Sequence, residues 1–527
     1  MVDLTQLPLG TQSFSALRAG HQIYVDKTAM IAELARGRNK IFLARPRRFG
    51  KSLLVSTFAS LFERGLADFD GLAIAELWQD KTYPVVQLDF STIANFDSVE
   101  RFESRLKSML SVRFGRLGFT PSGHEDRFMD EFSEWLSHRD LSSVVLLIDE
   151  YDSPLTGTLN EPVLFSGIQS VLREFYNILK SNEGGFRFLF LTGITRFSNT
   201  SIFSGFNNLN DISLEPDYGT LLGYTESELN AHFNDFFDQA AETVHLTRPA
   251  LMTRLRDYYD GFSFDRDGKT HVYCPWSILN FLSKNFRFEN YWFASGGQPS
   301  VLMNFLAVRK LEKPLDFLNT VSMDPSLLLS SAPYDALDVN ALLHQTGYLT
   351  IRSVDAGGTL QLGYPNREVA ASMALLYAKV MVGDEQFTSQ QLLSHMLCGN
   401  VARVVEFLNR VLNALDYQRY PIRDEASLRG ALQILMIGLS LRPQIEVHTA
   451  KGRSDLEVET GDFHWVFELK FAKAGTNVAS LCREALAQIR DHRYGQTAHG
   501  RQVIRVAMVF EETARQITEW EKEEEKA

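Results

Sequence analysis

Residues that could bind a phosphate group occur together in one short turn near the start of the chain. The turn contains Gly50, Lys51 and Ser52, follows the apolar run 41–44 and leads into a helix-forming segment. A strand, a tight turn and a helix N-terminus in this order present backbone N–H groups and the positive end of a helix dipole to an anion. In such a turn, Lys51 is expected to contact the β- and γ-phosphates of a nucleotide, and the Ser52 hydroxyl to coordinate Mg²⁺.

The turn departs from the usual phosphate-loop pattern at its first position. The pattern G-x-x-x-x-G-K-[ST] begins with glycine, whereas this sequence has Arg45 there. A basic surface turn is the alternative explanation for Gly-Lys-Ser alone. However, Arg47 and Arg48 add positive charge within the turn, and no acidic residue occurs between Ala35 and Phe62. A solvated basic face usually carries acids as well, so the pattern favours a phosphate site with both arginines as nucleotide-binding candidates.

Two carboxylates that end another apolar run could supply the rest of a nucleotide site. Asp149 and Glu150 directly follow the run 143–148. Packing does not explain acids at the end of a buried strand, because an ionised carboxylate is costly to bury unpaired. Asp149 is expected to hold Mg²⁺, and Glu150 to orient and deprotonate the attacking water.

A second set of charged residues lies near the C-terminus. Asp455 is followed thirteen residues later by Glu468 and then by Lys470, with the turn 460–462 between them. Side chains alternate along a strand, so Glu468 and Lys470 share a face, and a hairpin can bring Asp455 opposite. Two carboxylates can bind a divalent cation and a lysine can polarise or deprotonate water, which suits phosphodiester hydrolysis. An exposed strand with a Glu–Lys pair is the common alternative, but Gln488 on the following helix favours the catalytic interpretation.

The elements around these residues indicate an α/β fold. Apolar runs alternate with helical patterns in the first part of the chain, which predicts a parallel sheet with helices on both faces. Ligands bind at the carboxyl ends of such strands, where Gly50, Asp149 and Thr192 all lie. Thr192 is therefore a candidate γ-phosphate contact, with a capping role as an equal alternative. Arg196 is a weaker candidate to reach the site from its own or a neighbouring subunit.

A chain of 527 residues suggests about three domains. The middle of the chain is rich in helical patterns, and it ends in a helix over 339–345 and two strands around the turn 355–358, a winged-helix-like arrangement. The C-terminal region reads α-β-β-β-α-β, and its charged tail is predicted to be a frayed helix. The predicted domains are an ATPase-like domain over 1–215, a helical segment over 216–384 and a nuclease-like α/β domain over 385–527.

Composition excludes several classes of protein. A net charge of −12 argues against a bulk polyanion binder, so nucleic acid would need a local basic groove. The three cysteines are scattered without metal-site spacing, which fits a reducing compartment and argues against disulfides or zinc. The N-terminus lacks a basic start and no run approaches about 18 apolar residues, so neither a signal peptide nor a membrane span is expected. A cytoplasmic protein is the resulting prediction.

Four motifs together resemble a known family. They are Arg45-Pro-Arg-Arg-Phe-Gly-Lys-Ser52, Leu147-Ile-Asp-Glu-Tyr-Asp152, Tyr259-Asp-Gly-Phe262 and Gly452-Arg-Ser-Asp…Phe-Glu-Leu-Lys470. The chain resembles bacterial AAA-ATPase-like proteins with a C-terminal PD-(D/E)XK nuclease domain, over nearly its whole length, and the arginine that begins the loop is typical of that family. The resemblance implies a P-loop ATPase core, a helical middle segment and a restriction-endonuclease-like domain.

The resemblance also implies roles for individual residues. It assigns phosphate and Mg²⁺ binding to Lys51 and Ser52, ATP hydrolysis to Asp149 and Glu150, and nuclease catalysis to Asp455, Glu468 and Lys470. Glu425 is the least certain assignment, as an additional acid on a helix. Carboxylate oxygens without cysteine or histidine select Mg²⁺ or Mn²⁺ over zinc at the second site.

Three functions follow from these observations. The first is an ATP-regulated, metal-dependent DNA nuclease, and the intact Asp455, Glu468 and Lys470 favour it. The second is a switch NTPase whose nuclease-like domain only binds nucleic acid or a partner. The third is a nucleotide-sensing scaffold, against which Glu150 favours hydrolysis. ATP and DNA are the expected ligands. The sequence allows both a monomer and a homo-oligomer. A role in defence against foreign DNA rests on analogy alone.

Overall fold

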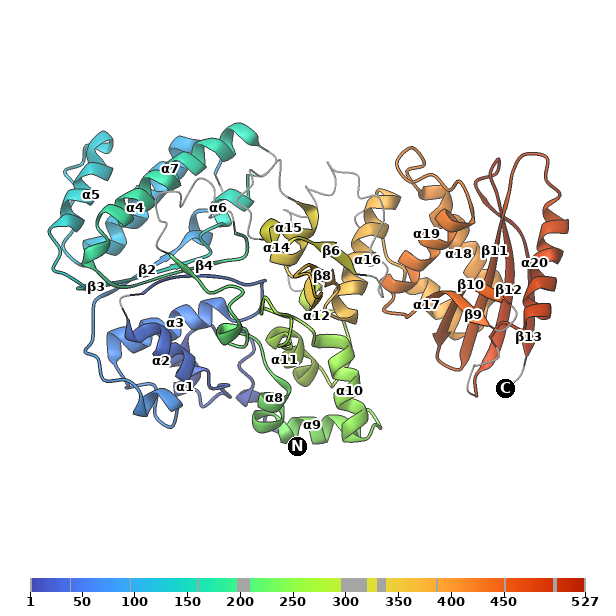
Figure 1. Cartoon of the computed structure of the whole chain (residues 1–527), viewed down its shortest axis with the longest axis horizontal. Helices are drawn as coiled ribbons and strands as arrows, with labels where there is room; N and C mark the ends of the chain where they lie inside the picture. Colours follow the sequence, from blue (N-terminus) through green and yellow to red (C-terminus); the bar gives the residue numbers. More distant parts are fainter. Residues whose placement is uncertain are drawn as a thin grey trace. The chain divides into compact units, whose positions relative to one another are not determined.

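The structure is a computed structural model of the chain (Figure 1). Contacts group the described residues into two compact units, the first reaching Asn366 and the second starting at Arg367. The boundary expected near 384 therefore falls inside the second unit, and the three-domain division stays a prediction. The described residues are 2–37, 39–94, 96–158, 161–196, 209–294, 320–328, 338–384, 387–449, 452–495 and 500–525.

A five-stranded parallel sheet forms the centre of the first unit. Its spatial order is β2-β3-β4-β1-β5, so β4 lies between β1 and β3. Every residue of β3 and β4 is buried, as their largely apolar sequences predict for a sheet covered on both faces. The strands are β1 (Lys40–Ala44), β2 (Val85–Asp89), β3 (Val144–Asp149), β4 (Phe186–Gly193) and β5 (Asn210–Asp211).

Helices cover both faces of this sheet, as predicted. Phe188 and Phe190 pack against Phe58 of α3 on one face. Leu189 and Leu191 belong to the core on the other face, together with residues of α4, α5 and α7. Figure 1 shows these three helices on one side of the sheet. The helices of this part are α1 (Phe14–Ala19), α2 (Thr28–Arg36), α3 (Lys51–Arg64), α4 (Val99–Gly115), α5 (Phe128–Ser137), α6 (Ser153–Thr156) and α7 (Pro162–Ser181).

The rest of the first unit is mainly helical and has its own hydrophobic core. Its helices are α8 (Glu226–His232), α9 (Asn234–Thr243), α10 (Arg248–Tyr259), α11 (Pro275–Ser283), α12 (Tyr291–Ala294), α14 (Pro325–Leu328) and α15 (Val339–Gln345). The predicted helix over 339–345 and the hairpin after it are confirmed. A third strand that was not predicted joins the hairpin in the order β6-β8-β7, with β6 (Val321–Met323), β7 (Thr350–Val354) and β8 (Leu360–Gly363).

The second unit combines helices with a mixed five-stranded sheet in the order β13-β12-β11-β10-β9. Only β11 and β12 are parallel neighbours, and α20 connects them. Its helices are α16 (Arg367–Val382), α17 (Gln390–Leu397), α18 (Val401–Ala414), α19 (Glu425–Gly438) and α20 (Val478–His492). Its strands are β9 (Gln444–Thr449), β10 (Gly452–Thr460), β11 (Phe463–Ala472), β12 (Gln502–Glu511) and β13 (Gln516–Glu525).

The order of elements predicted for this region is confirmed up to β12, but the prediction of a helical tail is wrong. The tail is β13, which pairs antiparallel with β12. The eight central residues of β12 are buried, and its backbone needs a hydrogen-bonding partner on the side away from β11. Ile517 anchors the tail, because its side chain is buried and its backbone exchanges two hydrogen bonds with the Asn409 side chain. Among the described helices, none has the length and apolar character needed to cross a membrane.

Candidate functional sites

The loop between β1 and α3 has the backbone geometry of a phosphate site. Gly50 has φ +99°, a left-handed conformation that glycine adopts without strain, and it is the N-cap of α3. No side chain caps this helix. The first N–H groups of α3 therefore lie at the loop, where the helix dipole favours an anion.

The structure brings Lys51 and Glu150 together at this loop. Lys51 is almost completely buried, and its ammonium donates hydrogen bonds to the carbonyl oxygens of Arg45 and Pro46, both at 3.1 Å. The same nitrogen is 4.0 Å from Oε1 of Glu150. Glu150 has φ +51°, an unusual conformation for a residue with a side chain, and such outliers are common at functional sites.

The carboxylate of Asp149 and the hydroxyl of Ser52 also lie within hydrogen-bond reach, as their predicted joint binding of Mg²⁺ requires. Asp149 is buried at the end of β3 and accepts a hydrogen bond from the N–H of Glu150 at 2.9 Å. Burial raises the pKa of Asp149 to about 6, with Glu150 and Asp89 adding to the rise, while the Ser52 hydroxyl and Lys51 oppose it. A hydroxyl and a carboxylate in this position are hard oxygen donors that fit Mg²⁺, and a cation there would favour the ionised carboxylate.

The side chains of Thr192 and Arg196 do not line the pocket at this site. The Thr192 side chain is fully buried and its hydroxyl donates to the carbonyl of Leu43 at 2.7 Å, which joins β4 to β1. Arg196 is buried and forms an ion pair with Asp211. The role of Thr192 as a γ-phosphate contact stays a prediction, and this geometry matches the capping alternative better.

The unusual first residue of the loop has a structural explanation. Arg45 is buried, and its guanidinium donates to the carbonyl oxygens of Ala44, Ser213 and Tyr218 at 3.0, 2.5 and 3.1 Å. It also lies 4.3 Å from the ring centre of Phe264. Burial lowers the pKa of Arg45 to about 9. The arginine side chain thus fastens the start of the loop to the segment that follows β5.

A pocket of about 260 Å³ opens beside the loop and contains most of the predicted nucleotide-binding residues. Within it, the Arg48 guanidinium lies 4.3 Å from the ring centre of Trp276, and burial lowers its pKa. The sequence analysis missed the wall of the pocket opposite the loop, whose residues occur far apart in the chain and form no motif. The pocket is lined by Arg47, Arg48, Gly50, Lys51, Ser52, Leu53 and Glu150 and, on the missed wall, by Pro8, Gly10, Thr11, Gln12, Tyr224, Pro275, Trp276 and Leu279.

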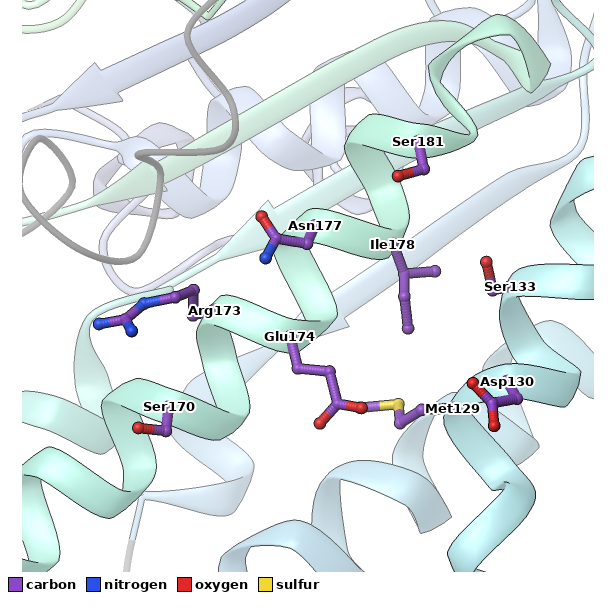
Figure 2. A pocket seen from close by; sticks show the side chains of 9 residues that line it. All are labelled: Met129, Asp130, Ser133, Ser170, Arg173, Glu174, Asn177, Ile178 and Ser181. Atoms are coloured by element: carbon purple, nitrogen blue, oxygen red, sulfur yellow. The ribbon is translucent and has the colours of Figure 1, made fainter.

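A second hollow, of about 360 Å³, lies between α5 and α7 (Figure 2). Polar side chains from the exposed side of α7 line most of it, including Arg173, Glu174 and Asn177, and Asp130 and Ser133 lie on α5. None of the residues predicted to do chemistry contributes to it. This hollow is therefore not part of the nucleotide site.

In the second unit, the hairpin of β10 and β11 brings Asp455 to Glu468 and Lys470. The pairing of the two strands ends at Leu456 with Phe467. One residue further, Oδ2 of Asp455 accepts a hydrogen bond from the N–H of Leu469 at 2.9 Å. The predicted hairpin is confirmed, and Asp455 lies beside the strand that carries the other two residues.

Glu468 is the most deeply buried member of this group, with 2% of its surface exposed. Burial, with a smaller contribution from Asp455, raises its pKa to about 7, and Lys470 opposes the shift. Lys470 donates to Oε1 of Glu468 at 3.0 Å and to Gln488 at 3.1 Å. Among the residues that the structure describes, buried Oε2 of Glu468 has no hydrogen-bond partner. An unpartnered carboxylate oxygen beside a second carboxylate fits a divalent cation with oxygen ligands.

The neighbouring helix α19 contributes two more charged residues. Glu425, in its first turn, is close enough to raise the pKa values of both Glu468 and Lys470. Arg429 lies 3.3 Å from Oδ1 of Asp455. Within the described residues, no three His, Cys, Asp or Glu side chains are grouped so that they could hold a metal ion. Asp455 and Glu468 stay the pair of carboxylates that the sequence predicts as metal ligands.

Comparison with known proteins matches both regions. Residues 8–203 match the family described as predicted AAA-ATPase, and residues 424–520 match the PD-(D/E)XK nuclease superfamily. A protein from Azotobacter chroococcum mcd 1, named "Uncharacterized protein in vnfD 5'region", is 30% identical over 511 residues, which cover 94% of each chain. No solved structure matches the chain.

Proposed function

Because the chain belongs to the family of predicted AAA-ATPases with a C-terminal PD-(D/E)XK nuclease domain, we propose that it hydrolyses ATP and thereby controls a metal-dependent DNA nuclease. The observation that carries the nuclease proposal is the buried Glu468, which lies next to Asp455 and Lys470. Its Oε2 has no hydrogen-bond partner among the described residues. The contact between Lys51 and Glu150 in the nucleotide pocket supports the ATPase proposal.

In the ATP site, each residue has a distinct task. The N–H groups of the loop and the first turn of α3 bind phosphate oxygens, and Lys51 exchanges its bonds to loop carbonyls for bonds to the β- and γ-phosphates. Glu150 orients a water toward the γ-phosphorus and accepts its proton. Ser52 and Asp149 would hold Mg²⁺, which would supply positive charge to stabilise the transferred phosphoryl group.

The adenine ring has a suitable place on the opposite wall of the same pocket. Trp276 lines that wall, with the Arg48 guanidinium over one face of its ring, and Thr11 and Gln12 offer polar groups to a base or a ribose. Aromatic faces bind nucleobases by stacking, which is worth about 1–3 kcal/mol for each base in nucleic-acid complexes. Arg47 and Arg48 belong to the phosphate loop and line the same pocket, so we assign at least one of them to the phosphates.

In the nuclease site, Lys470 is held by Glu468 and Gln488 and presents a positive charge to the scissile phosphate. Asp455 and Glu468 would hold Mg²⁺ or Mn²⁺, which supplies Lewis-acid activation of water and phosphate. The attacking water forms the new P–O bond while the bond to the leaving oxygen breaks. Gln488 keeps the ammonium of Lys470 beside the carboxylates during this reaction.

The experiment that tests the proposal uses the full-length protein with plasmid and single-stranded DNA. Cleavage is measured with Mg²⁺ or Mn²⁺, with and without ATP, and ATP hydrolysis is measured in parallel. Lys51→Ala should lower ATP affinity by roughly 10- to 100-fold, because a buried charged donor to phosphate is lost. Unchanged ATP affinity in folded Lys51→Ala protein would contradict the ATP site, and DNA that stays intact under all conditions would contradict the nuclease.

One observation favours a second candidate, a switch NTPase whose C-terminal domain binds nucleic acid without cutting it. Each of the two carboxylates already has a cationic partner, since Arg429 contacts Asp455 and Lys470 contacts Glu468. This arrangement is electrically balanced without a metal ion. DNA binding that is unaffected by Asp455→Ala, together with no cleavage, would identify this function.

A further inference from the structure

Carboxylates lie side by side on three neighbouring strands of the second unit. The ladder between β9 and β10 pairs Val447 with Ser454 and Ile445 with Leu456. Glu446 on β9 is therefore opposite Asp455 on β10, and Glu468 lies on the next strand, β11. Glu446 had no predicted role, and the sequence offers no motif around it.

Arg429 of α19 bridges two of these carboxylates. One of its terminal nitrogens lies 3.0 Å from Oε1 of Glu446, and the other lies 3.3 Å from Oδ1 of Asp455. The Arg429 side chain is largely buried, with 17% of its surface exposed. Glu446 has a second cationic partner, because Arg453 lies 3.1 Å from its Oε2.

The backbone of Glu446 is held in an uncommon conformation at this point. Its φ of +51° lies in the left-handed region, within an otherwise extended strand. Residues with a side chain adopt this conformation at a cost, so the surrounding contacts have to maintain it. At the same residue, the ion pair with Arg429 holds the side chain.

We propose that Arg429 competes with the divalent cation for Asp455. This inference rests on the metal-dependent nuclease proposed above. Asp455 is the expected metal ligand, and a cation arriving beside it would be repelled by a guanidinium 3.3 Å from the same carboxylate. Arg429 does not have to become unpaired when it leaves, because its other nitrogen stays with Glu446. Arg429 is thus a positioning residue that keeps Asp455 neutralised until metal binds.

The test measures metal affinity directly, so it does not depend on DNA cleavage. Mn²⁺ is titrated into full-length, nucleotide-free protein, and free Mn²⁺ is followed by electron paramagnetic resonance. Asp455→Ala serves as the blank that lacks this site. Arg429→Ala should bind Mn²⁺ about tenfold more tightly than the unmodified protein, because the competing charge is gone. Arg453→Ala is the matched control, since it removes a guanidinium from Glu446 without touching Asp455, and it should change the affinity less than about twofold.

Two further measurements distinguish loss of the competing charge from misfolding of Arg429→Ala. Arg429→Lys keeps one positive charge but cannot bridge two carboxylates, so its Mn²⁺ affinity should lie between those of the unmodified protein and Arg429→Ala. Without metal, Arg429→Ala should unfold at a lower temperature than Arg453→Ala, and saturating Mn²⁺ should remove that difference.

The outcomes separate this inference from the proposal on which it rests. If the unmodified protein and Arg429→Ala bind Mn²⁺ equally, and Asp455→Ala does not bind it, the metal site stands and the competition by Arg429 is refuted. Weaker binding in Arg429→Ala also refutes it, because the arginine would then help to build the site. If Asp455→Ala binds Mn²⁺ like the unmodified protein, the metal site and the competition both fail.

Discussion

Asp149 and Glu150 are adjacent in the sequence, yet their surroundings suit them to different steps. Asp149 is buried beside Ser52, while a quarter of the Glu150 side chain is exposed at the pocket. A buried acid that meets a hydroxyl suits a metal ligand, and an acid that lines the pocket suits the activation of water. This difference predicts separable effects of two substitutions.

Replacing Glu150 by Gln should preserve ATP binding and block hydrolysis. The amide keeps the size of the side chain but cannot accept the proton of the attacking water, so the rate should fall by about 100-fold or more. Asp149→Ala should instead weaken the Mg²⁺-dependent part of ATP binding. Equilibrium binding and single-turnover hydrolysis measure the two effects, with the exposed Glu134→Gln as control. Hydrolysis at the unmodified rate in Glu150→Gln would remove Glu150 from this role.

Asp260 lies in the motif Tyr259-Asp-Gly-Phe262, which has no role in either site. The surroundings of its carboxyl group predict that the stability of the protein depends on pH. Burial raises its pKa from 3.8 to about 6, and its buried Oδ1 has no hydrogen-bond partner in the described part of the chain. A raised carboxyl pKa means that the folded state binds the proton more tightly than the unfolded state. Ionised Asp260 therefore lowers the stability progressively between pH 3.8 and about 6, and the loss is complete above that range.

Asp260→Asn should consequently stabilise the protein at pH 7.5 by about 1–2 kcal/mol and have little effect at pH 4. The neutral amide can still accept the hydrogen bond from the backbone at Gly261 that Asp260 accepts. Thermal unfolding at the two pH values measures the change, with the exposed Asp140→Asn as control. Equal stabilisation at both pH values would show that the effect comes from packing and not from ionisation.

At the scale of elements, the turn after α10 is fixed by a close backbone contact. Gly261 has φ +92°, and a Cβ added to it would lie 2.1 Å from the carbonyl oxygen of Pro365. Gly118 has nearly the same φ, +90°, but a Cβ there would meet nothing within 4 Å. The two glycines therefore separate the cost of the backbone conformation from the cost of the contact.

Gly118→Ala should destabilise the protein by about 1 kcal/mol, through backbone strain alone. Gly261→Ala should cost at least about 3 kcal/mol, because the turn and the segment at Pro365 must also move apart. Chemical denaturation of both variants measures the difference. Equal destabilisation would mean that the segment at Pro365 shifts freely, and the turn would then not be fixed by this contact.

The elements also show which parts of the structure could be predicted from the sequence. The loop around Gly50 and the hairpin that carries Glu468 are local, so spacing and alternation are sufficient to identify them. The tail is different, because its charged composition suits a helix while the free side of β12 requires a strand. Trp276 lies more than 200 residues from the phosphate loop in the sequence, and only tertiary packing brings the two to one pocket.

The charged residues of the nuclease site show a similar limit. Asp455, Glu468 and Lys470 could be placed together because they lie on two strands joined by a short turn. Arg429 and Glu446 come from a helix and from the next strand, and their side chains meet Asp455 through packing between elements. Sequence spacing identifies the members of a site that share one hairpin more readily than the members that come from other elements.

At the scale of the whole molecule, the two sites belong to different compact units, and this separation predicts which activities can be lost independently. Asp455→Ala or Lys470→Ala should reduce DNA cleavage by at least about 100-fold, because each removes a group that we propose contacts the metal or the phosphate. Neither residue contributes to the nucleotide pocket, so ATP hydrolysis should stay within about twofold of the unmodified rate. The exposed Lys473→Ala, on the segment after β11, is a control for Lys470.

The reverse experiment tests whether ATP controls cleavage. Lys51→Ala leaves the second unit intact, so its effect on cleavage reports communication between the units and not damage to the nuclease site. We expect Lys51→Ala to cleave DNA at one rate with or without ATP, whereas the unmodified protein should respond to ATP. Plasmid cleavage with and without ATP measures this response in both proteins. If the unmodified protein cleaves DNA equally in both conditions while hydrolysing ATP, the two activities are independent and control by ATP is excluded.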